Sequence, residues 1–288
     1  MEKVGIIGAG LMGTGIAFVA ASHIDGETVV VDVGDEILAK SRRTVEKLAA
    51  RTVEKGQATA EQTGTWLKRL RHSTDRSDLG GASFIIEAVP ENLKLKNQIF
   101  VAIDEKCPAE TILASNTTGL PITQIAAGTR HPERIIGAHF FNPAPLMKLV
   151  EIVRGYATSQ ETVGKIMEFC SRLGKETILV EKDYPGFITT RVMNGYLMEA
   201  LNCLQDGVGS VADIDKGCRL AYNHPMGPFQ LMDLVGLDTV LPVLESLQAN
   251  YGERFRPPQL LRQMVAAGKL GRKSGAGFYD YPKKEKSS

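Results

Sequence analysis

A histidine and a glutamate twelve positions apart are the side chains of this sequence best suited to proton transfer. His139 ends an apolar run that begins at Ile135, and Glu151 lies within a second apolar run, 149–153. Imidazole has an unperturbed pKa near neutrality, so it can accept a proton and return it. A carboxylate bonded to one ring nitrogen would fix the tautomer and stabilise the charged ring. The spacing is consistent with an acid/base pair, and equally with a core histidine beside a strand-edge glutamate.

A glycine-rich turn near the amino terminus predicts a dinucleotide site. Residues 8–13 have the pattern G-x-G-x-x-G, directly after the apolar run 4–7 and before a stretch of helical length. In such a turn Gly8 permits a tight bend, Gly10 lets the backbone approach a pyrophosphate, and Gly13 lets helix pack closely on strand. The first N–H groups of the following helix then face the phosphates.

An acidic residue indicates which dinucleotide binds there. The second apolar run, 28–32, ends in Asp32, nineteen positions after Gly13. A carboxylate at this point accepts hydrogen bonds from the adenosine ribose and repels a 2′-phosphate. No arginine or lysine follows before Lys40. NAD is therefore favoured over NADP; the competing interpretation is that Asp32 is only a helix-capping or surface acid.

The elements that must position these residues alternate short apolar runs with longer amphipathic ones. Periodicity predicts strands over 4–7, 28–32, 84–87, 112–115, 135–139, 149–153 and 177–180. It predicts helices over 11–22, 35–55, 93–106, 121–127 and 160–173, with a further polar helix leading to Leu70 and Asp35 as a helix cap. Such alternation predicts a Rossmann-type, mostly parallel sheet with helices on both faces.

The pattern changes at Tyr184-Pro185-Gly186, after which only helical periodicity remains. We predict helices over 187–206, 211–221, 237–251 and 258–267, with a break at 225–228 and a solvated tail over 283–288. The predicted domains are an α/β NAD-binding domain, 1–184, and an all-α domain, 185–288. Residues 231–237 are apolar enough to need a partner surface, or else to pack within the helical domain.

Composition excludes several classes of function. Lys and Arg number 34 against 33 Asp and Glu, so no long-range charge favours nucleic acid or a membrane surface. The four cysteines are scattered without metal-ligand spacing, which predicts reduced thiols in the cytoplasm and no metal site. Residues 4–21 superficially resemble a signal peptide, but five glycines interrupt them. No other stretch approaches the roughly 20 apolar residues that a bilayer span needs.

Taken together, the ordered motifs resemble those of the L-3-hydroxyacyl-CoA dehydrogenase family, especially its short members, the 3-hydroxybutyryl-CoA dehydrogenases. The resemblance runs nearly end to end. Its motifs are Gly8–Gly13, Glu87–Lys94, Ser115–Thr117, His139–Pro143, Met147–Glu151, Pro185–Phe187, His224–Pro228 and Gly271–Tyr279.

The resemblance implies that (S)-3-hydroxyacyl-CoA and NAD⁺ give 3-ketoacyl-CoA and NADH, a reaction of fatty acid metabolism. His139 would be the catalytic base and Glu151 its orienting partner. A homodimer through the helical domain is also implied. The glycine motif and the resemblance together predict cofactor contacts from Gly8, Gly10, Leu11, Met12, Gly13, Asp32, Glu91, Lys96, Asn116, Asn142 and Lys273. Without the resemblance, Lys96 and Lys273 would be predicted to be solvated.

Two departures from the family pattern concern the substrate. Where the family has two serines after Ser-Asn-Thr, this chain has Thr118 and Gly119; Thr118 keeps a hydroxyl and is predicted to bind substrate. Where the family has an asparagine after Pro-Gly-Phe, this chain has Thr190; the resemblance implies a catalytic role there, for which threonine offers one hydrogen-bond donor in place of the two of an amide. Lys55 matches a lysine associated with a coenzyme A phosphate, and an exposed helix-end lysine explains it nearly as well.

Two other functions remain open at this point. The substitutions at Thr118, Gly119 and Thr190 leave room for a dehydrogenase of a free hydroxy acid or sugar acid. A cofactor-binding structural or regulatory protein without catalysis is the third hypothesis. The intact pair His139 and Glu151 argues against it.

Overall fold

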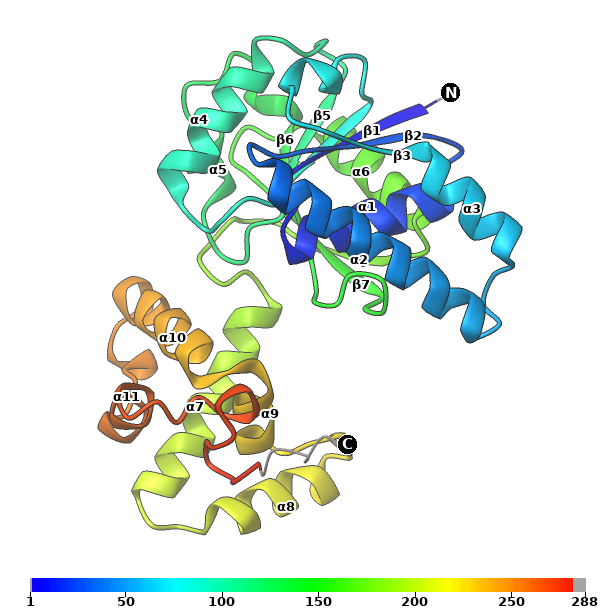
Figure 1. Cartoon of the computed structure of the whole chain (residues 1–288). Helices are drawn as coiled ribbons and strands as arrows, with labels where there is room; N and C mark the ends of the chain where they lie inside the picture. Colours follow the sequence, from blue (N-terminus) through cyan, green and yellow to red (C-terminus); the bar gives the residue numbers. More distant parts are fainter. Residues whose placement is uncertain (1, 282–288) are drawn as a thin grey trace. The chain divides into compact units, whose positions relative to one another are not determined.

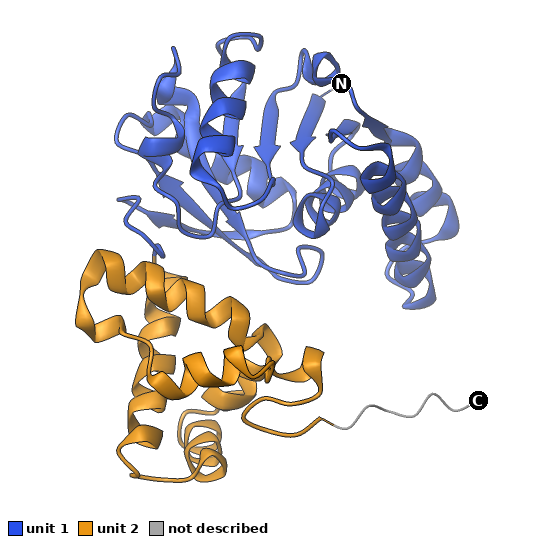
Figure 2. Cartoon of the chain, turned by 60° about the vertical axis from the view of Figure 1, so that its left-hand side comes forward, with its two compact units in different colours: residues 1–187 blue, residues 188–288 orange. Residues whose placement is uncertain are grey.

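The computed structural model describes residues 2–281, and the chain divides into two compact units, 1–187 and 188–288 (Figure 2). The predicted domain boundary after residue 184 lies three residues before this division. The tail predicted over 283–288 lies outside the described residues. Each unit is described by itself below.

Unit 1 is built on one eight-stranded sheet with the strand order β3-β2-β1-β4-β5-β6-β7-β8 (Figure 1). All neighbouring strands are parallel except β6 and β7, which are antiparallel. The strands are β1 (Glu2–Ile7), β2 (Gly26–Val31), β3 (Leu70–Ser73), β4 (Phe84–Glu87), β5 (Ile112–Ser115), β6 (Ile135–Phe140), β7 (Leu149–Arg154) and β8 (Glu176–Val180).

Helices cover both faces of this sheet, which confirms the predicted Rossmann-type architecture. They are α1 (Leu11–His23), α2 (Asp35–Glu54), α3 (Ala60–Arg69), α4 (Leu93–Asp104), α5 (Ile122–Ile125) and α6 (Gln160–Arg172), with 3₁₀ turns at Arg76–Leu79 and Pro132–Arg134. Apolar side chains of α1 and α6 form one buried cluster with the sheet. Those of α4 and α5 form another on its opposite face. Alternate strand residues enter each cluster, as the pleat requires.

Helix starts follow local side-chain chemistry. Thr59 and Gln62 form a reciprocal capping box at α3, and Asn92 accepts the Leu95 N–H at the start of α4. The prediction that Asp35 caps α2 is wrong, because Gly34 occupies the cap position. Asp35 instead lies in the first turn of α2, where its negative charge interacts favourably with the positive end of the helix dipole.

Unit 2 is entirely helical in the part that the structure describes, as predicted. Its helices are α7 (Thr189–Gln205), α8 (Val211–Ala221), α9 (Pro228–Val235), α10 (Leu237–Tyr251) and α11 (Gln259–Ala266), with 3₁₀ turns at Glu253–Phe255 and Arg272–Ser274. Helix α9 was not predicted, because the sequence pattern assigns Pro228 to a break at 225–228. Pro228 is instead the first residue of α9, a position that proline favours. Met232 of α9 is buried in the core of unit 2, whereas Leu234 and Val235 are about half exposed.

Two buried aspartates fix the end of unit 2. Asp215 accepts hydrogen bonds from the N–H groups of Phe229 and Gln230 and from the Tyr279 hydroxyl. Asp233 accepts hydrogen bonds from the N–H groups of Phe278 and Tyr279 and from the hydroxyl of Tyr281. A Cβ on Gly271 would lie 2.3 Å from the Asp233 carbonyl oxygen, and one on Gly277 would lie 2.0 Å from Asp233 Oδ1, which accounts for two of the three glycines of the motif that ends at Tyr279. Among residues 2–281, no helix is both long and apolar enough to cross a membrane.

Candidate active site

The antiparallel pairing of β6 and β7 brings His139 and Glu151 directly opposite each other. The imidazole Nδ1 lies 2.8 Å from Glu151 Oε2. His139 is 6% exposed and Glu151 is fully buried, so little water competes for this bond. The bond assigns the neutral ring its proton on Nδ1, donated to the carboxylate, which leaves a lone pair on Nε2.

Two aromatic rings lie close to the imidazole. The Phe141 ring centroid lies 4.5 Å from that of His139, and the Phe187 centroid lies 6.0 Å away. Among residues 2–187, no group hydrogen-bonds to Nε2. A ring held on one side and unbonded on the other can exchange a proton through Nε2.

A buried lysine that sequence reasoning missed holds the loop after β6. Lys175 Nζ donates to the carbonyl oxygens of Ala144 (2.7 Å) and Met147 (2.8 Å). Burial lowers the pKa of Lys175 from its ordinary value. This anchor sets the course of the connection between the His139 and Glu151 strands. No motif surrounds Lys175, so nothing in the sequence pointed to it.

The glycine turn lies at the carboxyl end of β1, where open α/β sheets bind their ligands. Gly8 has φ +100°, and a Cβ there would lie 2.8 Å from the Ala88 carbonyl oxygen. A Cβ on Gly13 would lie 1.8 Å from the Gly8 carbonyl oxygen, whereas a Cβ on Gly10 would meet no atom within 4 Å. The fold itself thus requires Gly8 and Gly13, while Gly10 borders open space suited to a pyrophosphate.

Asp32 lies beside that turn. Its Oδ2 accepts a 2.7 Å hydrogen bond from Ala9 N, and Oδ1 accepts one from Val33 N. Asp32 is therefore not a helix cap, because Gly34 occupies that position of α2. At the start of α1, Leu11 is exposed and Met12 is half buried. The carboxylate, the open glycine and the helix start together fit a dinucleotide.

The ends of β4 and β5 carry the next predicted cofactor residues. Lys96 is 1% exposed, which rules out the alternative interpretation as a solvated helix lysine; its contact with the cofactor stays a prediction. Its Nζ lies 2.7 Å from Glu87 Oε1 and 3.4 Å from Glu91 Oε2. Glu91 Oε1 accepts a 2.9 Å bond from the backbone N–H of Thr118, whose side chain is exposed.

The two predicted asparagines differ in environment. Asn116 Oδ1 accepts a 2.8 Å hydrogen bond from Phe140 N, which ties the end of β5 to the residue after His139. Asn142 is exposed and precedes Pro143 through a cis peptide bond. Asn116 is thus a structural link at this edge of the sheet as well as a predicted cofactor contact.

Comparison with known proteins identifies the family. Residues 3–184 match the model of the 3-hydroxyacyl-CoA dehydrogenase NAD binding domain, and residues 186–281 match that of the 3-hydroxyacyl-CoA dehydrogenase C-terminal domain. The chain belongs to the 3-hydroxyacyl-CoA dehydrogenase family. It is therefore an oxidoreductase whose cofactor is NAD, and the resemblance found in the sequence is confirmed.

Relatives in this family match over nearly the whole chain. A probable 3-hydroxybutyryl-CoA dehydrogenase of Bacillus subtilis is 43% identical, covering 99% of each chain. The crystal structure of (S)-3-hydroxybutyryl-CoA dehydrogenase from Ralstonia eutropha has a TM-score of 0.94 and 42% identity, covering 98% of this chain and 100% of that one. A diketoreductase structure has a TM-score of 0.86 and 30% identity, covering 98% and 99%.

Lys55 of this dehydrogenase-family chain borders a hollow in unit 1 of about 460 Å³. The walls come from α1, α2, α3 and the loop that follows β6. The lining residues are Phe18, Val19, Ser22, His23, Leu48, Arg51, Thr52, Lys55, Gln57, Trp66, Pro143, Pro145 and Leu146. The hollow is thus lined by two basic side chains, Arg51 of α2 and Lys55 at its end, and also by the loop that follows β6, the strand of His139.

Two predicted site residues of the family lie in unit 2. Thr190 stands near the start of α7, and its carbonyl accepts a 2.8 Å bond from Asn194 Nδ2. Lys273 is about half exposed and pairs with Asp238 at 2.5 Å. The half-exposed ammonium group of Lys273 is thus held in an ion pair.

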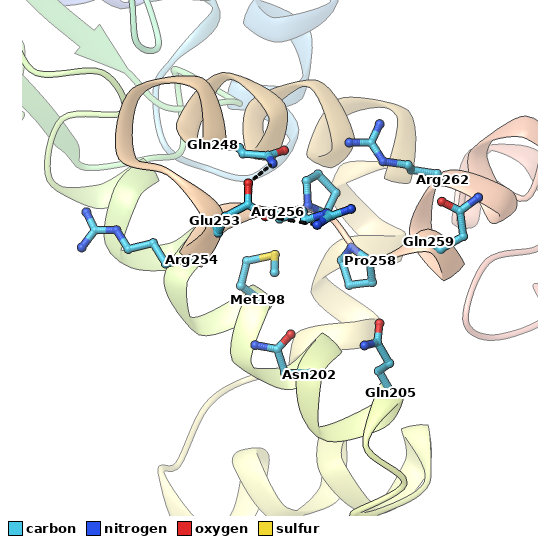
Figure 3. Close-up of a pocket in the computed structure, with 11 residues that line it drawn as sticks. Met198, Asn202, Gln205, Gln248, Glu253, Arg254, Arg256, Pro258, Gln259 and Arg262 are labelled. Carbon is cyan, nitrogen blue, oxygen red and sulfur yellow. Dashed lines mark hydrogen bonds and ion pairs between the residues drawn. The ribbon is translucent and has the colours of Figure 1, made fainter.

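Unit 2 also has a polar cavity of about 850 Å³ between α7, α10 and α11 (Figure 3). Of its three arginines, Arg256 pairs with Glu253, Arg262 pairs with Glu245, and Arg254 lies over the Tyr251 ring. None of the predicted site residues lines it.

The cysteines and acidic groups of the described chain form no metal centre. Within residues 2–281, no cluster of three or more His, Cys, Asp or Glu side chains could hold a metal ion. All four cysteines are unpaired. Burial raises the pKa of Cys170 to about 12, so this thiol stays protonated.

Proposed function

We propose that the chain interconverts (S)-3-hydroxyacyl-CoA and 3-ketoacyl-CoA, with His139 as general acid/base. The observation that carries the proposal is the 2.8 Å bond between His139 Nδ1 and buried Glu151, with Nε2 unbonded within unit 1. Short acyl chains are favoured because relatives at 43% and 44% identity are named probable 3-hydroxybutyryl-CoA dehydrogenases. The reaction places the enzyme in fatty acid metabolism.

Proton transfer follows from this geometry. In oxidation, His139 Nε2 takes the proton of the substrate 3-hydroxyl, and Glu151 stabilises the imidazolium that results. Bound NAD⁺ supplies the acceptor for the hydride that leaves C3. In reduction, the same imidazolium returns its proton to the ketone oxygen. The alcohol thus loses a hydride and a proton, and both are accounted for.

The hollow beside Lys55 supports coenzyme A as the carrier group. Arg51 and Lys55 offer positive charge for phosphates, and Trp66 offers an aromatic wall. Pro145 and Leu146 extend the same hollow to the loop after His139. A thioester bound along it would direct its acyl end toward the histidine strand.

The two threonines receive separate assignments. Thr118 is assigned to the substrate oxygen, since its hydroxyl replaces that of a serine. Thr190 is assigned a weaker contact with the substrate than the asparagine of the family would make, because a hydroxyl has one donor and an amide has two. A Thr118→Ala variant with unchanged kcat/KM would remove that residue from the site.

Turnover of acetoacetyl-CoA with NADH, followed by absorbance, tests the proposal. We expect oxidation of NADH and a much weaker rate with NADPH. A series of 3-ketoacyl-CoA thioesters of increasing chain length should show the highest kcat/KM for the shortest members. Binding of NAD⁺ by calorimetry without turnover of any thioester would favour the non-catalytic hypothesis instead.

A free dicarbonyl or hydroxy acid is the second candidate substrate. The similarity to a diketoreductase structure favours this candidate. Assays at equal concentration of acetoacetyl-CoA and free acetoacetate separate the two, and a higher kcat/KM for the free acid would overturn the CoA assignment.

We further propose a cytoplasmic homodimer formed through unit 2. The unpaired cysteines support a reducing compartment. Nine of the sixteen exposed large apolar side chains among the described residues lie in unit 2, the smaller unit, which supports a subunit interface there. They are Ile188, Val192, Met193, Val208, Leu220, Tyr222, Leu234, Val235 and Leu260. Light scattering that gives a monomer mass at micromolar concentration would reject the dimer.

A further inference from the structure

A buried carboxylate at the end of β4, Glu87, has no part in the proton transfer proposed above. It is fully buried. Its Oε1 accepts bonds from Val89 N (2.6 Å) and Lys96 Nζ (2.7 Å), and its Oε2 accepts one from Ser115 Oγ (2.7 Å). Three donors from three segments therefore converge on this one side chain.

A second carboxylate extends the cluster. Glu91 Oε2 lies 3.4 Å from Lys96 Nζ, and Glu91 Oε1 accepts a 2.5 Å bond from Thr117 Oγ1. Two carboxylates thus share one ammonium group. When all three groups are ionised, the cluster of Glu87, Glu91 and Lys96 has a net charge of about −1.

The cluster lies against the glycine turn. Glu87 pairs with Ile7 in the sheet, and Ala88 N donates a 2.7 Å bond to the Ile7 carbonyl. A Cβ on Gly8 would lie 2.8 Å from the Ala88 carbonyl oxygen. The peptide that follows Glu87 therefore packs directly on the turn that fits the dinucleotide.

The other side of the cluster leads to the histidine strand. Asn116 N donates a 2.7 Å bond to the Glu87 carbonyl, and Asn116 Oδ1 accepts from Phe140 N at 2.8 Å. Phe140 follows His139 in β6. Glu87 is thus the junction between the glycine turn and the end of the strand that holds the imidazole.

The negative charge of the cluster of Glu87, Glu91 and Lys96 should affect how tightly the two redox forms of the cofactor bind. A buried ammonium group needs a paired anion, and Glu91, whose side chain is 43% exposed, is too solvated to pair fully with Lys96. The proposed hydride transfer requires the nicotinamide ring to lie beside His139, at the strand end that Glu87 joins to the glycine turn. That ring is positively charged in NAD⁺ and neutral in NADH. A net negative cluster in a site of low polarity favours the charged ring.

We propose that Glu87 is a positioning residue that fixes Lys96 and maintains a net negative charge at this edge of the sheet, so that the protein binds NAD⁺ more tightly relative to NADH. The assignment rests on the proposed position of the nicotinamide beside His139, and it does not depend on which thioester is the substrate.

Direct titration of the full chain with NAD⁺ and with NADH, in the absence of any thioester, tests the proposal. Glu87→Gln keeps the shape and removes the charge. We expect its ratio Kd(NAD⁺)/Kd(NADH) to rise about fivefold, the size of effect that one unit charge produces in a partly solvated site. Ser115→Ala removes one bond and keeps the charge, so its ratio should stay unchanged.

A second buried ion pair supplies the matched control. Asp104, the last residue of α4, pairs with Arg134 at 2.7 Å. Asp104→Asn should lower stability while leaving the cofactor ratio unchanged. Should Glu87→Gln fail to fold, Glu87→Met also removes the charge at nearly the same side-chain length and should raise the ratio in the same direction. An unchanged ratio in the folded variants, or an equal rise in Asp104→Asn, overturns the proposal.

Discussion

Buried carboxylates occur in both units, and they are used in opposite ways. In unit 1, Glu151 binds one nitrogen of His139, and the other ring nitrogen has no hydrogen bond within that unit. In unit 2, Asp215 and Asp233 each accept bonds from two backbone N–H groups and a tyrosine hydroxyl. The first carboxylate orients a titratable group, and the other two join chain segments.

The difference shows how to separate carboxylates that support chemistry from those that support the fold. Burial, and then the bond to Asp215, raise the pKa of Tyr279 well above its ordinary value, so its hydroxyl remains a donor at any physiological pH. Such a contact cannot take part in a proton cycle. A carboxylate bonded to one nitrogen of an imidazole can, because the other ring nitrogen is able to accept and return a proton. We therefore expect variants of His139 and Glu151 to lower the rate, and variants of Asp215 and Asp233 to lower stability.

The largest expected effect is that of His139→Ala. Removing a positioned acid/base should lower kcat about 10²- to 10⁴-fold, measured by NADH oxidation with acetoacetyl-CoA. The thermal midpoint should also fall, because the ring is buried against Phe141 and Phe187 and its removal takes a bond from Glu151. The rate is therefore measured at a temperature where circular dichroism shows the variant to be folded. Full activity in this variant would remove His139 from the proposed mechanism.

Glu151→Gln should have the next largest effect. The amide keeps the shape but cannot stabilise an imidazolium by charge, so kcat should fall about 10²-fold. Affinity for NADH, measured by fluorescence titration, should stay close to that of the unmodified protein. Loss of NADH affinity in proportion to kcat would show that Glu151 supports the fold of unit 1 and not the histidine.

Asp233→Ala tests the opposite behaviour in unit 2. Three donors lose their acceptor, so the free energy of unfolding should fall by about 3 kcal/mol. The midpoint of chemical denaturation, followed by far-ultraviolet circular dichroism, measures the loss. Asp206→Ala is the control, because Asp206 is exposed and lies at the end of α7; it should change stability by less than about 0.5 kcal/mol. A larger fall in the control than in Asp233→Ala would contradict the comparison.

Much of the fold was predictable because strands buried on both faces are continuous apolar runs. The strands 84–87 and 112–115 were predicted with their observed ends. Strand β3 was missed because Arg71 and His72 give it no apolar run, which an edge strand does not need. Tertiary pairing with β2, not local propensity, makes it a strand.

The residues of the site could be predicted one by one from the sequence, but their distances and orientations could not. His139 and Glu151 were placed on separate strands, yet their antiparallel register depends on the packing of the whole sheet. Glu87 had a usable signal that was overlooked, since it is an acid directly after the buried run 84–86. Lys175 had none, because its partners are backbone carbonyls whose position only the folded chain defines.

The smallest expected effect is a pH response confined to unit 1. Burial, and then the charge of Arg42, lower the pKa of His72 to about 4 from 6.5. Arg71 and Glu46 line the same small hollow, and Ser41 Oγ lies 3.0 Å from the ring. Between pH 6.5 and 4 the unfolded chain therefore binds a proton that the folded unit does not, so stability falls as the pH is lowered through this window.

Trp66, the only tryptophan of the chain, packs edge-on against Phe18 and reports on unit 1 alone. Its fluorescence in urea should show stability falling by about 1 kcal/mol from pH 6.5 to 4, a figure reduced because solvent screens a half-buried ring. His72→Gln should abolish this slope, whereas His131→Gln, at a more exposed histidine, should retain it. Equal slopes in both variants would mean that acid acts on the stability of unit 1 through groups other than His72.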